Sequence, residues 1–271
     1  MESLESELAA ARELEVDTLA DAIESIGFEC TRCGGCCTGY APDEPGGAPA
    51  NESGDEATST SDDETTAPQE SPSTDPETGD DREPHTATVF PDEVRELVEA
   101  AESTPEEAAD VAYDWRDVAR PMPYGLSEDA DGQPVGETFE WALATDGCGD
   151  CTFYEESDGQ GACTVHDARP LICQTYPFSV ALGGTTQPMG EAVDAEGMVR
   201  AHECEGLGRD ISREDAEELA AALKERAIRE LEEAIGVRDT YDPTAADRAN
   251  SDLVVFDSEG PKRSDGEPVD G

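Results

Sequence analysis

The sequence is poor in basic side chains, in aromatic side chains and in long apolar runs. Its 271 residues include 17 Lys and Arg against 67 Asp and Glu, and aromatic residues make up 5% of the chain. No run approaches the roughly 20 apolar residues that a bilayer crossing needs. The first ten residues, MESLESELAA, lack the basic and apolar segments of a signal peptide. We therefore expect a cytoplasmic protein with no membrane partner.

The net charge of −50 excludes a further class of partner. Neutralising the phosphates of a nucleic acid needs a basic face, and no stretch of this chain provides one, so we expect no nucleic-acid partner. Only two of the basic residues are lysines, and this acid-rich, lysine-poor composition resembles that of halophilic proteins. At about 1 M salt the Debye length falls to about 3 Å, which relieves the repulsion between surface carboxylates. The composition thus predicts a salt-adapted protein.

The chain is interrupted by a segment that cannot form a core. Residues 41–84 contain no Val, Ile, Leu, Met, Phe, Tyr or Trp. Such a segment cannot bury enough apolar surface to offset its ordering entropy, so we predict a disordered acidic insertion. The insertion separates an N-terminal part of the core, 1–40, from the remainder of the same single domain, 85–257. Residues 258–271 are predicted to form a flexible tail.

The apolar pattern predicts helices at both ends of the chain. A stripe of Leu, Ile and Ala predicts a helix over 3–26 with a break in its middle, and another stripe predicts a helix over 212–235 that ends before Gly236. Between them we predict helices over 91–101 and 103–115, a strand over 138–144, and short strands beside the later cysteines. The expected fold class is α+β, in which helices flank a small irregular cysteine-bearing sheet stapled by metal.

Nine cysteines are the candidates for chemistry, and the first four form a C-x2-C-x2-C-C run: Cys30, Cys33, Cys36 and Cys37. Two-residue spacing brings two thiolates to one metal ion from a tight turn, and the Gly-Gly pair at 34–35 relaxes the backbone between them. The run begins like a bacterial ferredoxin motif and then departs from it at Cys37. Because adjacent side chains point apart, we do not expect Cys36 and Cys37 to serve the same metal ion.

The second group of cysteines is spread over a longer stretch and consists of Cys148, Cys151, Cys163, Cys173 and Cys204. Disulfides are disfavoured because the sequence shows no export signal. Burial as an ordinary core thiol suits one or two cysteines, above all Cys148, but not the four-cysteine run. A purely structural zinc site stays open. His166 and His202 lie close to this group in sequence, but each is interpreted as an ordinary surface or core residue.

The order of these motifs resembles a known family. The segments FECTRCGGCC, CTFY and ACTVHDARPLICQTYPF, followed by a late cysteine, are similar to the YkgJ-type cysteine-cluster family, also described as the CxxCxxCC zinc- or iron-chelating domain. The resemblance implies metal chelation, as an iron–sulfur cluster or as zinc, and leaves Cys148 outside the ligand set. Carried over position by position, the implied ligands are Cys30, Cys33, Cys36, Cys37, Cys151, Cys163, Cys173 and Cys204.

Three functions follow as hypotheses. The first is an iron–sulfur protein serving electron transfer or metal handling, with Arg32 and Arg169 placed to stabilise an anionic cluster. The second is a zinc-stapled interaction module, which would lose its fold on chelation. The third is a methyltransferase-like or other protein-modifying enzyme that carries the cluster. No pair of carboxylates stands out as catalytic among so many acids. If the two cysteine groups share metals, the thiols of the two halves must converge in space.

Overall fold

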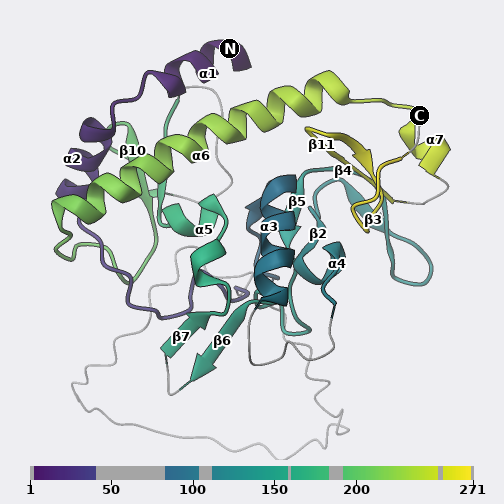
Figure 1. The fold of residues 1–271 in the computed structure, drawn as a ribbon, viewed down its shortest axis with the longest axis horizontal. Coiled ribbons are helices and arrows are strands. Elements are labelled where there is room, and N and C mark those ends of the chain that lie inside the picture. The colour runs from purple at the N-terminus through teal and green to yellow at the C-terminus, as the bar shows by residue number, and fades with distance from the viewer. Residues whose placement is uncertain are drawn as a thin grey trace, which may run out of the picture.

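The structure is a computed structural model that describes residues 3–40, 83–103, 112–157, 160–182, 192–249 and 253–269. Within these ranges, helices combine with four small sheets, which confirms the predicted α+β class (Figure 1). The predicted insertion falls outside the described residues from 41 to 82. Its two flanks are joined by an antiparallel bridge, in which Tyr40 and Glu83 exchange backbone hydrogen bonds.

The helices lie mainly where the apolar pattern predicts them. The predicted helix over 3–26 is two helices separated by residues 13–15, and the predicted helix over 103–115 falls largely outside the described residues. The helical elements are α1 (Leu4–Arg12), α2 (Val16–Ile26), α3 (Pro91–Glu102), α4 (Trp115–Val118), the 3-10 turn η1 (His166–Ala168), α5 (Leu171–Thr175), α6 (Arg213–Thr240) and α7 (Ala245–Ala249).

The strands form separate short sheets instead of one continuous sheet. Three sheets are antiparallel, with strand orders β1-β5-β2, β8-β10-β9 and β6-β7, and the fourth, β12-β11-β4-β3, pairs β11 with β4 in parallel. The bounds are β1 (Thr88–Val89), β2 (Ala119–Pro121), β3 (Leu126–Glu128), β4 (Pro134–Phe139), β5 (Trp141–Leu143), β6 (Tyr154–Ser157), β7 (Gln160–Cys163), β8 (Phe178–Val180), β9 (Ala192–Asp194), β10 (Val199–His202), β11 (Leu253–Asp257) and β12 (Gly260–Lys262).

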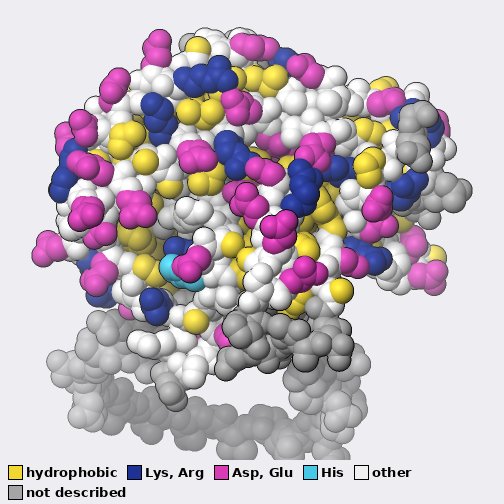
Figure 2. Space-filling view, in the orientation of Figure 1, with side chains coloured by type: hydrophobic (Ala, Val, Ile, Leu, Met, Phe, Trp, Pro, Cys, Tyr) yellow, Lys and Arg dark blue, Asp and Glu magenta, His cyan; other side chains and the backbone are white. Residues whose placement is uncertain are grey.

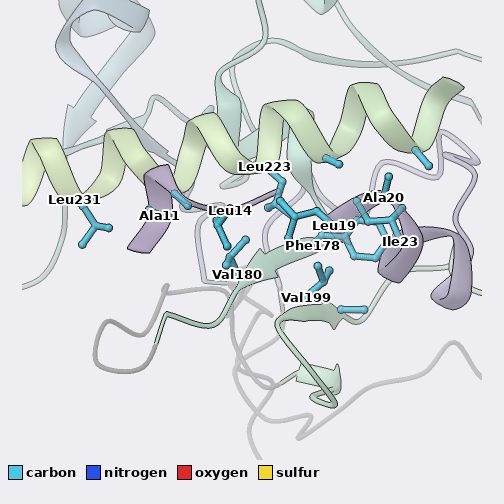
Figure 3. Close-up of a cluster of buried hydrophobic side chains, with 14 of the residues drawn as sticks. Ala11, Leu14, Leu19, Ala20, Ile23, Phe178, Val180, Val199, Leu223 and Leu231 are labelled. Carbon is cyan, nitrogen blue, oxygen red and sulfur yellow. The ribbon is translucent and has the colours of Figure 1, made fainter. Parts of the chain in front are cut away.

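The largest core lies between α6 and the N-terminal helices. Helix α6 packs against α1, α2 and α5, and its buried Leu223 meets Leu19 and Ile23 of α2 and Phe178 of β8 (Figure 3). Each such side chain is less than 2% exposed, and burying one stabilises the fold by about 1.5–3 kcal/mol. This packing fixes α6 along one side of the molecule, above the elements that carry the cysteines (Figure 1).

A second core lies under α3 and the β1-β5-β2 sheet, and the cysteines border it. Val94 and Leu97 of α3 and Trp141 of β5 are fully buried there, and Cys151 belongs to the same cluster. The partly buried thiols of Cys37, Cys163 and Cys173 pack against this cluster. A third, smaller core joins α7 to β11. The thiols therefore lie at the edge of an apolar interior, which limits their access to water.

Helix α6 continues beyond its predicted end, so the prediction that it stops before Gly236 was wrong. It runs to Thr240 because Gly236 serves close packing and not termination. A Cβ atom at this position would lie 2.5 Å from the Cβ of Ser258, at the start of the turn between β11 and β12. The missing side chain lets the helix lie directly against that turn, whose Ser258 N–H donates to the Glu233 carboxylate at 2.8 Å.

The C-terminal segment also has more structure than expected. The sequence analysis predicted a flexible tail over 258–271, whereas the described part of it, 258–269, contains β12 and a bridge between Lys262 and Pro268. Val269 is 7% exposed, and Val269 N–H donates to the Pro261 carbonyl at 2.9 Å.

Acidic side chains are spread over the visible face of the molecule, with basic and hydrophobic side chains between them (Figure 2). This distribution leaves no continuous basic area on that face. Among the helices that the structure describes, none has both the length and the apolar character needed to cross a bilayer.

Candidate metal centre

The C-x2-C-x2-C-C run folds as a tight turn between α2 and the bridge at Tyr40. Arg32 and Gly34 take left-handed backbone conformations, with φ of 57° and 81°, and Cys37 N–H donates to the Gly34 carbonyl at 2.7 Å. Glycine is the residue that adopts this conformation without steric cost, so Gly34 suits the turn. The turn closes on itself and brings Cys33, Cys36 and Cys37 onto one short loop.

The β6–β7 hairpin holds this loop from outside. Gly161 N–H donates to the Arg32 carbonyl at 2.8 Å. A Cβ atom at Gly161 would lie 2.7 Å from the ring of Tyr154 and 3.2 Å from the Cα of Gly34. Hairpin, aromatic ring and loop can approach this closely only because both positions are glycine. The contact brings Cys163, at the end of β7, towards the four-cysteine loop.

A second set of hydrogen bonds ties the loop to the C-x2-C turn of the later group. Cys151 N–H donates to the Cys37 carbonyl at 2.8 Å, and Gly39 N–H donates to the Asp150 carboxylate at 2.8 Å. Asp146 accepts from the N–H groups of Cys148 and Asp150 and so shapes the turn between them. Cys148 is exposed on this turn, so the interpretation of Cys148 as a buried core thiol was wrong.

The beginning of the loop meets the last cysteine through a short antiparallel pairing. Glu29 N–H donates to the Gly206 carbonyl and Gly208 N–H donates to the Gly27 carbonyl, both at 3.0 Å, around a Phe28–Leu207 bridge. Gly206 is required here, because a Cβ atom would overlap the Glu29 carbonyl oxygen. The pairing brings Cys30 and Cys204, which lie 174 positions apart in the sequence, to the same end of the site.

Helix α5 supplies the remaining cysteine. Pro170 precedes its first residue, and Cys173 N–H donates to the Pro170 carbonyl at 2.9 Å. Tyr176, at the end of the helix, donates its phenolic hydroxyl to the Glu203 carbonyl, next to Cys204. The segment 171–176 therefore links the part of the site around Cys173 with the part around Cys204.

The inner thiols resist ionisation. Burial above all, and then the neighbouring thiols of Cys163 and Cys36, raise the pKa of Cys151 to about 11. Burial also raises the pKa of Cys173, with the same thiols and Cys151 contributing. Arg169 is a cation that acts in the opposite direction on Cys173. Cys36, Cys151, Cys163 and Cys173 thus form one group, in which each ionised thiol raises the pKa of its neighbours.

A second group overlaps the first at Cys36. Burial raises the pKa of Cys204, and the thiols of Cys33, Cys36 and Cys30 contribute. The pKa of Cys36 itself is raised, first by its hydrogen bond to Cys37 and then by desolvation. Thiolates that repel one another in a desolvated site are stabilised by a metal cation, whose binding displaces their protons. The donor set therefore fits a metal centre.

The sulfur atoms of Cys36 and Cys37 lie 3.8 Å apart, so the expectation that these adjacent side chains point apart was wrong. The turn that starts at Gly34 rotates the two side chains towards each other. Among the described residues, no three His, Cys, Asp or Glu side chains are already arranged around one ion. The ligand set as a whole thus stays a prediction, and Cys36 and Cys37 are the pair placed close together.

The histidines lie where the sequence interpretation puts them. His166 is exposed on η1 beside Asp167, and His202 is a buried residue of β10 whose Nε2 lies 2.9 Å from the Ser179 hydroxyl. The third histidine, His85, directly follows the insertion: its backbone N–H donates to the Gly149 carbonyl at 2.7 Å, and burial lowers its pKa to about 4.

The comparison with known proteins concerns the same cysteines. The family model named CxxCxxCC, described as "Putative zinc- or iron-chelating domain", matches residues 29–205. The chain belongs to this family. All eight predicted ligands lie within the matched span, which begins one residue before Cys30 and ends one residue after Cys204. No curated protein and no solved structure matches the chain.

The CxxCxxCC match leaves out α1, α2 and α6, which build the largest core. Sequence reasoning also missed two buried charged residues beside the site, Glu93 of α3 and Arg226 of α6. Neither could be found from the sequence, because each resembles many other charged residues on helical stretches of this chain. Tyr176 was singled out only as part of the motif that ends in Phe178.

Proposed function

We propose that this CxxCxxCC protein holds iron in iron–sulfur centres built from thiolates of both halves of the chain. The observation that carries the proposal is the 3.8 Å separation of the Cys36 and Cys37 sulfur atoms. Two sulfur ligands about 2.3 Å from one tetrahedral ion lie about 3.8 Å apart, which is the edge of the tetrahedron. The pair is therefore spaced to share one metal ion.

This spacing also bears on the kind of centre. Four cysteines hold either a two-iron or a four-iron cluster, and in the two-iron form each iron takes two of the four thiolates. In the four-iron form each iron takes one, so neighbouring ligand sulfurs lie farther apart. A shared ion at Cys36 and Cys37 supports a two-iron cluster. The pairing of residues 27–29 with 206–208, which brings Cys30 and Cys204 to one end, supports a second site that includes Cys30, Cys33 and Cys204.

The same spacing supports a second candidate, a zinc-stapled interaction module, because tetrahedral zinc also takes adjacent thiolates at this separation. The two candidates differ in what the metal does. Zinc would only hold the loops together, whereas iron would exchange electrons or be passed on. The residues Cys30, Cys33 and Cys36 are exposed, so that edge of the centre is open to a partner protein. This exposure supports electron transfer or metal handling.

We propose further that the protein works in a cytoplasm of high salt concentration. The excess of 50 negative charges supports this, because repulsion among exposed carboxylates opposes folding unless ions screen it. Measurements on the metal centre should consequently be made in molar salt. In dilute buffer, loss of metal could merely follow loss of the fold.

The experiment is metal analysis of the full chain purified without oxygen in molar salt. We expect iron and acid-labile sulfide in equal amounts, with the visible absorption of a thiolate-bound cluster. Colourless protein containing only zinc would contradict the iron–sulfur proposal and support the second candidate. Cys37→Ser should remove metal from the shared site, while Cys148→Ser, the matched control, should keep the full amount. Unchanged metal content in Cys37→Ser would contradict the shared ion.

A further inference from the structure

Helix α5 is too short to be stable by itself, yet it carries a predicted metal ligand. It has five residues and carries Cys173, one of the predicted ligands. Isolated helices shorter than about 12–15 residues are marginal in water, so α5 depends on its surroundings for its position. Two buried charged side chains, from two different helices, form hydrogen bonds to its two ends.

The first end is held by Glu93 of α3. One carboxylate oxygen of Glu93 accepts from Leu171 N–H, the first residue of α5, at 2.9 Å. The other oxygen accepts from Phe90 N–H, at the start of α3, at 3.0 Å. The Glu93 residue is 6% exposed. A single buried carboxylate thus caps both helices and fixes the beginning of α5 relative to α3.

The second end is held by Arg226 of α6. Its guanidinium donates to the Thr175 hydroxyl at 3.0 Å and to the Phe178 carbonyl at 3.3 Å, and its Nε donates to Glu230 at 2.7 Å. The Thr175 hydroxyl in turn donates to the Leu171 carbonyl at 2.7 Å. Arg226 is 1% exposed, so these bonds form away from water.

We propose that Glu93 and Arg226 are positioning residues for the metal centre, which clamp α5 at both ends and so fix the sulfur of Cys173. The inference rests on the proposed function of the cysteines. It adds that α6, which lies outside the matched family span, takes part in holding a ligand. Hydrogen bonds that hold metal-ligating segments in place commonly change metal affinity by about 10- to 100-fold.

The test uses the full chain loaded with cobalt(II), whose thiolate charge-transfer absorption reports the geometry of the ligands. Wild type, Arg226→Met and Arg226→Lys are compared in molar salt, and transfer of cobalt to EDTA is timed. We expect Arg226→Met to release cobalt about 10-fold faster with a weakened charge-transfer band. Arg226→Lys should restore part of both, because an ammonium group can still donate to Thr175.

The matched control is Arg238→Met on the same helix. Arg238 pairs with Glu5 of α1 at 2.6 Å, so its loss removes an ion pair of α6 without touching α5 or the start of α3. The proposal is overturned if Arg226→Met releases cobalt at the wild-type rate, or if Arg238→Met accelerates release and weakens the band equally.

If Arg226→Met does not fold, Thr175→Val and Glu93→Gln decide the question, since both keep the buried volume and remove one contact of the clamp. Release at the wild-type rate from both folded variants overturns the proposal, and faster release supports it. A wild-type chain that binds no cobalt, zinc or iron would instead refute the proposed function itself.

Discussion

Substituting Gly206 by Ala tests how the two halves of the site are brought together. The new Cβ atom would overlap the Glu29 carbonyl oxygen, well inside the 3.0 Å that real Cβ atoms keep. It would also lie 3.0 Å from the Phe28 ring and 3.1 Å from the Glu29 carbonyl carbon, so the two segments must separate.

The magnitude follows from the pairing that the separation breaks. The segments must part by about half an ångström or more, and the 3.0 Å hydrogen bond from Glu29 to Gly206 would then exceed 3.5 Å, at which it no longer counts as one. Overpacking of this kind costs about 1–3 kcal/mol, and the lost hydrogen bond adds about 1 kcal/mol. Cys30 and Cys204 would move apart, while Cys37 and Cys151 keep their direct backbone bond.

We therefore expect Gly206→Ala to lose the metal of the Cys30–Cys204 end and to retain that of the Cys37–Cys151 end. Metal per chain, measured by mass spectrometry on folded protein in molar salt, should fall to about half if each end holds one centre. Gly147→Ala is the control, because a Cβ atom there would meet nothing within 4 Å. Full metal content and unchanged stability in Gly206→Ala would refute the reasoning, as would equal metal loss in both variants.

Two further predictions concern stability. Burial and the charge of Glu233 raise the pKa of Glu140 to about 7, so the folded state binds more protons than the unfolded state between pH 4.5 and 7. The free energy of unfolding should consequently fall as pH rises through this range, by about 3 kcal/mol at most. In urea titrations, Glu140→Gln should be more stable than wild type at pH 8 and equal to it near pH 4. Equal stability of the two proteins at pH 8 would contradict this prediction. Lys262→Met should cost about 3–5 kcal/mol, because it leaves the buried Asp257 carboxylate, 2.7 Å from the Lys262 ammonium, without that partner. The Asp257 carboxylate also accepts from the Trp141 indole, so tryptophan fluorescence reports the unfolding, and a loss below 1 kcal/mol would show the pair to be dispensable.

Local patterns predicted many of the helices and the turn at the first four cysteines. The apolar stripe containing Leu19 and Ile23 gave α2, and Pro91 marked the start of α3. The spacing of the first four cysteines predicted a tight turn, and the structure has one. These features depend on residues close in sequence, so their physical causes are visible in the sequence itself.

Contacts between distant segments could not be predicted in the same way. The pairing of residues 27–29 with 206–208 relies on a glycine with no side chain to show what it faces. Gly236 resembled a helix end because glycine commonly ends helices. Its actual role depends on the close approach of Ser258, which the sequence does not show. Glu93 and Arg226 differ from the other charged residues in being buried. The sequence, with its 67 acidic residues, does not indicate which of them is buried.

The meeting of Cys30 with Cys204 also orders events during synthesis. Chains emerge from the ribosome N-terminus first, at about 5–20 residues per second, so the four-cysteine loop waits roughly 10–35 seconds for its last partner. Helix α6, which holds α5, emerges later still. With the proposed ligands, the metal centre can be completed only after nearly the whole chain is made, and until then Cys30, Cys33 and Cys36 are exposed to oxidants and competing metals. Loading of this protein is thus a late step, and the thiols that begin the sequence need a reducing environment until it happens.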